Sequence, residues 1–183
     1  MFSLGVSPQK QRIKYPSLEF QIDPALLEPK IQDKELGIEI SPPAGWEKSD
    51  STFSNGGTLK ELRAIEMLVG NPKHIFQHNQ TNSLCILSKF ATNSVKNTEN
   101  LILRAKSGLE KQFPSAKIST ATFLKDKILV HQIMLLSPEY VIIKLICELD
   151  KLKVFEVVYI LPKNAYADQL RAIESSIGSI LGL

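Results

Sequence analysis

The chain has 183 residues, of which 43% are hydrophobic, 22% charged and 7% aromatic, a length that suits one globular domain and is short for two. The formal net charge of +3 is far from the concentrated basic surface that binding along a nucleic-acid backbone requires. The longest apolar runs are too short to cross a bilayer. Nucleic acid is therefore not an expected partner, and no transmembrane segment is expected.

The first residues, MFSLGVSPQKQ, lack the basic start, the long apolar stretch and the cleavage motif of a secretory signal. Two compartments stay open on this reasoning. The protein is expected to be cytoplasmic if Met1 is the native start, and to belong to the cell envelope if a signal peptide has been removed.

Residues 1–34 are expected to form a Pro-rich, extended N-terminal arm, because six of the ten prolines fall in the first 43 residues and proline interrupts regular elements. Within this arm, apolar side chains alternate with polar ones from Leu18 to Ile22. This alternation favours a short edge strand, whose mate would be Gly37–Ile40.

The segment from residue 50 to residue 82 is harder to interpret. Residues 50–57, DSTFSNGG, are expected to form a loop, and its Asn55-Gly56-Gly57 lacks the motif of a phosphate-binding turn. A capping box from Thr58 to Glu61 predicts a helix over residues 58–69, but the apolar pattern near its end also fits a strand. Residues 70–82 are expected to be a connection.

The remaining pattern is regular and defines the fold class. Apolar alternation and short turns predict one strand, a helix, four consecutive antiparallel strands and a final helix capped by Asn164. The expected ranges are 83–90, 98–113, 116–124, 128–136, 140–149, 154–161 and 164 to the chain end. The prediction is an α/β (α+β) domain over residues 35–183, in which an antiparallel meander is sandwiched between helices.

The three histidines carry no strong chemical signal. His74 and His78 have the spacing of two metal ligands on a helix, but the glutamate of HExxH is missing and the surroundings suggest a loop. They are interpreted as surface histidines. His131 lies in the middle of a predicted strand and is expected to be partly buried and hydrogen-bonded, or to face solvent.

Cys85 and Cys147 both lie in apolar strands, where buried thiols are inert. They do not have the spacing of a zinc site, and whether they are bridged stays open, because a disulfide requires adjacent strands. Trp46, the only tryptophan, is interpreted as an anchor that closes one end of the sandwich.

Small residues also occur in the two best helices. Gly108 and Gly178 are expected to allow close packing against the sheet. Three serines near the chain end fall off the apolar stripe of the last helix and are expected to face solvent. These are Ser175, Ser176 and Ser179.

Two segments give the chain a family resemblance. GIEISPPAGW, residues 37–46, resembles the opening of PsbP-like domains, and KVFEVVYILPKNAYADQLRAIESSIGSI, residues 153–180, resembles their ending. The resemblance covers residues 35–183 and implies the fold shared by PsbP, the Ran-binding protein Mog and the bacterial DcrB lipoproteins. It further implies a non-catalytic protein-binding or assembly role, and it identifies no binding residue.

The expected function follows from this resemblance and from the missing motifs. The first hypothesis is an accessory protein that presents a sheet face, an edge strand or the arm to another protein. The alternative is a chaperone or carrier that holds an apolar ligand or helix in a hydrophobic groove. No catalytic residue, cofactor-binding residue or metal ligand is predicted, and the protein is not expected to be an enzyme.

Overall fold

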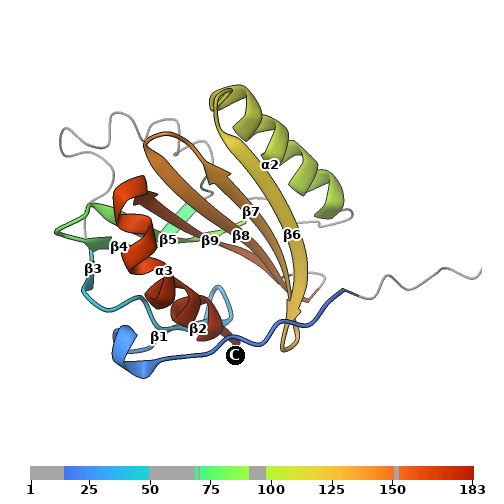
Figure 1. Cartoon of the computed structure of the whole chain (residues 1–183). Coiled ribbons are helices and arrows are strands. Elements are labelled where there is room, and N and C mark those ends of the chain that lie inside the picture. Colours follow the sequence, from blue (N-terminus) through green and yellow to red (C-terminus); the bar gives the residue numbers. More distant parts are fainter. Residues whose placement is uncertain (1–14, 50–68, 70, 91–97, 151–152) are drawn as a thin grey trace, which may run out of the picture.

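The computed structural model describes residues 15–49, 69, 71–90, 98–150 and 153–183. Their elements follow in chain order, with a short 3-10 helix (η1) near the start (Figure 1). They are η1 (Pro24–Leu26), β1 (Ile31–Asp33), β2 (Ile38–Ile40), β3 (Trp46–Lys48), β4 (Asn71–His78), β5 (Ser83–Lys89), α2 (Thr98–Gln112), β6 (Lys117–Lys125), β7 (Ile128–Leu136), β8 (Tyr140–Asp150), β9 (Lys153–Pro162), α3 (Lys163–Gly178) and β10 (Leu181–Gly182).

The main sheet has seven strands in the order β3-β4-β5-β9-β8-β7-β6, and every neighbouring pair is antiparallel. The predicted meander from β6 to β9 is confirmed. A two-residue turn joins β6 to β7, with Lys125 paired to Ile128 and with Asp126 at a φ of 54°. Such tight turns force consecutive strands to lie side by side.

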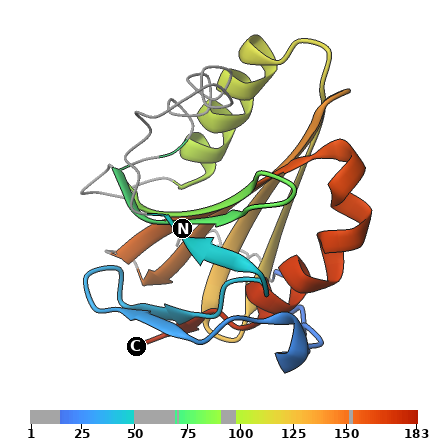
Figure 2. The same ribbon diagram turned by 90° about the vertical axis from the view of Figure 1, so that its left-hand side faces the viewer.

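The predicted sandwich is also confirmed, because α2 and α3 cover opposite faces of the main sheet (Figures 1 and 2). Side chains alternate along β8, so that Ile143 and Leu145 pack on the α3 side while Ile142 packs on the α2 side. The α3 core is closed by Ile173 and Ile177, and the α2 core by Leu109.

A second, three-stranded sheet, in the order β1-β2-β10, lies beside the lower end of α3 (Figure 2). The last helix was predicted to continue to the chain end, and this is wrong, because α3 ends at Gly178 and the chain continues as β10. Ile180 is buried in the α3 core, which turns the following residues onto β2. α3 begins after Pro162, and no side chain caps it, so the expected Asn164 cap is wrong as well.

The arm differs from the predicted pairing. Leu18–Ile22 does not pair with Gly37–Ile40, because the mate of β2 is β1, only a few residues upstream. The Asp33 carboxylate accepts hydrogen bonds from the amides of Glu35 and Leu36, at 2.8 Å each, and Gly37 has a φ of 72°. These features close a local hairpin, which has a much smaller loop-closure cost than pairing with a distant segment.

The predicted connection over residues 70–82 is wrong between Asn71 and His78, which form β4. A register shift between Pro72 and His74 breaks the alternation that identifies strands in a sequence. The predicted loop at 50–57 and the helix or strand at 58–69 lie outside the described residues, except for Val69, which is buried in the α2 core.

Candidate functional site

His74 and His78 lie on β4 rather than in a loop, and both are partly buried. His74 Nε2 lies 2.8 Å from Asp33 Oδ2, whereas the His78 ring contacts the Trp46 ring with a centroid separation of 6.4 Å. The two imidazoles thus have different partners. No group of three potential ligands that could hold a metal is found among the described residues.

The Asp33 carboxyl is an anchoring group of the small sheet. Burial raises its pKa, but hydrogen bonds from the Leu36 amide, from His74 and from the Glu35 amide outweigh burial and lower the pKa below the ordinary 3.8. Asp33 is therefore held as a carboxylate that joins β1 to β4.

His131 is buried, with 2% of its surface exposed, on the α2 side of the main sheet. Its Nδ1 lies 3.0 Å from Thr122 Oγ1 on β6, and its Nε2 lies 3.0 Å from Glu148 Oε1 on β8. A hydroxyl, an imidazole and a carboxylate in this sequence of contacts are also the groups that activate a nucleophile in hydrolytic enzymes. Such a site also needs access for a substrate, and this ring is enclosed within the sheet, so the contacts are interpreted as a cross-strand link.

A buried ion pair lies beside this link. Lys144 Nζ is 2.7 Å from Glu156 Oε1, and the hydroxyl of Ser88, directly opposite Glu156 on β5, makes no hydrogen bond with the described residues. Charged side chains are therefore buried on the α2 side of the sheet. The sequence carries a weak signal for it, since Lys144 interrupts an otherwise apolar run in β8.

Cys85 and Cys147 lie on β5 and β8, which are separated by β9, so the two thiols are free and unbridged. Both are fully buried, and burial raises their pKa values far above the ordinary range. They behave as core residues, as predicted.

The serines of α3 are the clearest error of the sequence interpretation. Ser175 and Ser176 are fully buried, and the Ser176 hydroxyl donates to the Ser41 carbonyl at 2.7 Å while lying 2.9 Å from the Tyr159 hydroxyl. Ser175 Oγ accepts a hydrogen bond from the amide of Asp23 in the arm at 3.1 Å. This side of α3 is not exposed to solvent, because the arm and the segment after β2 cover it.

The two helical glycines have different surroundings. A side chain at Gly178 would lie 2.7 Å from Phe20 Cβ and 2.9 Å from Ile22 Cγ1, so this glycine allows the arm, not the sheet, to approach α3. A side chain at Gly108 would meet nothing within 4 Å. The expected close packing at Gly108 is therefore wrong.

The arm reaches the outer edge of β6. The Leu124 amide donates to the Pro16 carbonyl, and the Leu18 amide donates to the Leu124 carbonyl, both at 2.8 Å. Ser17 is thereby bridged to Leu124 in parallel orientation, and the Phe20 ring packs on that of Phe123. β6 is an edge strand of the main sheet, and within the described residues the arm covers only its last part.

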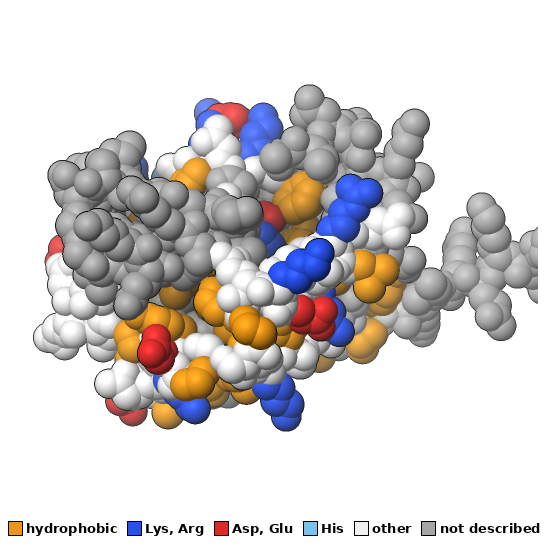
Figure 3. Space-filling model, turned by 90° about the horizontal axis from the view of Figure 1, so that it is seen from above, with side chains coloured by type: hydrophobic (Ala, Val, Ile, Leu, Met, Phe, Trp, Pro, Cys, Tyr) orange, Lys and Arg blue, Asp and Glu red, His pale blue; other side chains and the backbone are white. Residues whose placement is uncertain are grey.

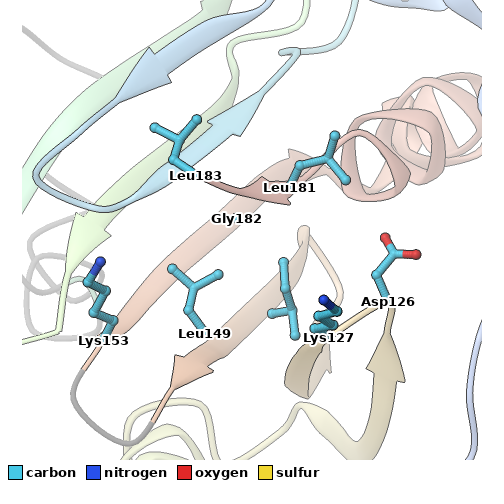
Figure 4. A pocket seen from close by; sticks show the side chains of 8 residues that line it. Asp126, Lys127, Leu149, Lys153, Leu181, Gly182 and Leu183 are labelled. Atoms are coloured by element: carbon cyan, nitrogen blue, oxygen red, sulfur yellow. The ribbon is translucent and has the colours of Figure 1, made fainter.

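A cavity of about 370 Å³ lies at the end of the main sheet, below β10. Figure 4 shows the Leu149 side chain between those of Lys153 and Lys127, with Leu181 and Leu183 on the strand above. Gly182 faces Leu149 so closely that a side chain there would lie 3.0 Å from Leu149 Cδ2. The cavity therefore combines apolar walls with a charged rim, and its lining residues come from strands, a turn and the chain end rather than from a helix.

Within the described residues, no helix combines the length and the apolar character that crossing a bilayer requires. No protein-family model and no curated protein matches the sequence.

A solved structure does match the fold. It is the solution structure of cyanobacterial PsbP (CyanoP) from Synechocystis sp. PCC 6803, with a TM-score of 0.56 over 88% of this chain and 95% of that chain. The sequence identity is 11%, so the likeness concerns the fold alone. The chain has a PsbP-like α+β fold, as the resemblance of residues 37–46 and 153–180 predicted.

Proposed function

We propose that this chain is a non-catalytic accessory protein that binds another protein, with residues 35–183 as the binding domain and residues 1–34 as its arm. The observation that supports this proposal best is the edge of β6. Within the described residues, the arm pairs with this nine-residue strand only near Leu124, and the preceding residues of the strand form an edge of the main sheet. Unpaired strand edges are a common means of recruiting a polypeptide.

The likeness to cyanobacterial PsbP supports the fold on which this surface lies. The chemistry of the described residues agrees with a binding role: the buried thiols are protonated, and His131 and Lys144 are engaged with carboxylates inside the sheet. All of these groups are buried, so none of them presents reactive chemistry at the surface, and an adaptor requires none.

The test is affinity capture from native extract with the full chain, with excess untagged chain as competitor, followed by mixing of the purified components. A saturable complex of fixed stoichiometry is expected. Removal of the arm serves as a control, since it separates binding by the arm from binding by the domain. If neither the full chain nor the arm-deleted chain retains a protein that the untagged chain can displace, the proposal is wrong.

Carriage of an apolar ligand is the second candidate, because the 370 Å³ cavity exceeds the lower limit of about 300 Å³ for small-molecule sites. The cavity lies between the end of the main sheet and β10 rather than between a sheet and a helix. Titration with decanoate, observed at the methyl groups of Leu149 and Leu181, tests this function. Gly182→Leu should fill the cavity and abolish the shifts, and equal shifts in that variant would exclude the cavity as the site.

A further inference from the structure

We infer that an extended, acidic segment of the partner adds to β6 as a further strand of the main sheet. This inference rests on the proposed function and specifies its docking mode and the chemistry of the partner. It requires that the backbone of β6 be open, that its side chains permit close approach, and that the charge nearby select the partner.

The backbone requirement follows from the register of β6. Leu124 directs its amide and carbonyl outward to the arm, and in an antiparallel ladder the outward residues alternate. Ile118, Thr120 and Thr122 therefore direct theirs outward as well, while Ser119 and Ala121 pair with β7. No backbone partner for those three outward residues is found within the described part of the chain.

The side chains at this edge permit close approach. Ser119, Thr120 and Ala121 are small, uncharged and exposed, and the lysines of β6 lie only at its two ends. The opposite edge of the sheet differs, because β3 has three residues and exposes Glu47 and Lys48. Short length and charge are the usual protection of an edge strand, and residues 118–122 of β6 have neither.

The local charge favours an acidic segment. Lys117 is exposed at the start of β6, and Ile118 packs in the core that α2 closes. Cations outnumber carboxylates among the described side chains of α2, and Figure 3 shows Lys and Arg side chains, with Asp and Glu side chains among them, on the face seen from above. The cations of α2 are Arg104, Lys106 and Lys111, and its carboxylate among the described side chains is Glu110, which lies 3.7 Å from Lys106. Such charge steers an acidic strand toward this edge.

A second copy of the chain fits this edge less well. A two-fold axis between two β6 strands would pair residues 118–122 only, because the arm occupies the edge at Leu124. A strand from a different protein therefore fits the outward amides and carbonyls of β6 better than a second copy of the chain does.

The experiment uses the full chain, labelled for amide NMR, and a blocked peptide of alternating valine and threonine with glutamate at both ends. We expect the amide signals of Ile118, Thr120 and Thr122 to shift in a salt-sensitive manner. A peptide with lysine at both ends is the control and should bind more weakly. In Thr120→Pro the outward donor is lost while the ladder to β7 is kept, and binding should fall about tenfold or more.

Matched variants keep the test informative if proline disturbs folding. Thr120→Val should bind like the wild type, Thr120→Glu should bind more weakly and Thr120→Lys should not. Equal binding by Thr120→Glu and Thr120→Lys, or slow hydrogen exchange at Thr120 in the free protein, would overturn the inference. Concentration-dependent shifts of the same amides without peptide would overturn it in favour of a second copy.

The same variants separate this inference from the proposed function. If Thr120→Pro still captures the partner found with the wild type, β6 is not the docking edge, although the chain does bind a protein. If the wild type captures no partner, the proposed function itself fails.

Discussion

Lys144 and Glu156 form an ion pair of 2.7 Å between β8 and β9, with only 7% and 3% of their side chains exposed. The two residues are diagonal neighbours, because Lys144 is opposite Val158 and Glu156 is opposite Ile146. The pair lies on the α2 side of the sheet, beside the apolar core that α2 covers. Each charge therefore has an opposite charge within ion-pair distance in the interior of the protein.

Replacement of one partner should destabilise the protein strongly. Lys144→Met leaves Glu156 as a buried carboxylate without its ammonium, and we expect a loss of about 3–5 kcal/mol in the free energy of unfolding. Urea unfolding followed by circular dichroism measures this loss. The double variant with Glu156→Leu should recover most of it, and a double variant as unstable as Lys144→Met would contradict the account of the pair.

The two helical glycines should respond oppositely to alanine. Gly108→Ala meets open space and should raise the unfolding free energy by about 0.5–1 kcal/mol, because alanine favours the helix. Gly178→Ala places a methyl group against Phe20 and should displace the arm. The rate of limited proteolysis within the arm, after residue 15, measures how often the arm leaves α3. Equal cleavage rates in both variants would refute the packing of Phe20 against Gly178.

The stability of the small sheet should depend on pH through Asp33. Its lowered pKa means that the carboxylate form stabilises the fold, so this contribution is present above the ordinary value of 3.8 and is lost as the pH falls through the lowered pKa. Asp33→Asn should cost about 1 kcal/mol at neutral pH. The difference from the wild type should disappear in acid, as measured by urea unfolding across pH. A difference independent of pH would exclude the carboxylate as its cause.

Cys85 and Cys147 should not react with thiol reagents in the folded protein. Burial raises both pKa values, so almost no thiolate is present near neutral pH. Labelling with Ellman's reagent should proceed only after unfolding in urea, when both thiols should react. Rapid reaction of either cysteine in the native protein would show that its strand is accessible.

The elements predicted best are those whose pattern reflects local burial. Successive side chains of β8 point to opposite faces of the sheet, and both faces are apolar. Tight turns join β8 to β7 and to β9, so these three strands must pair with one another. β4 was missed because Pro72 and the following register shift disturb the alternation, and pairing with β5 stabilises the strand nonetheless. The local signal is weak wherever a distant partner determines the structure.

The candidate surfaces illustrate the same limit. β6 was predicted as a strand, but its position at the sheet edge depends on the pairing of β5 with β9, which are distant in the sequence. Ser175 and Ser176 appear polar in the sequence, and only the approach of the arm and of Ser41 places them in the interior. The small residues around Gly178 are the one signal that could have indicated a close approach.

Amide hydrogen exchange on the complex with the captured partner tests the central claim most directly. We predict that exchange at Ile118, Thr120 and Thr122 is rapid in the free chain and slows strongly when the partner is bound, while Ser119 and Ala121 are protected in both states. Unchanged exchange at these three outward amides in a stoichiometric complex would contradict the claim that the partner is bound as a strand on β6.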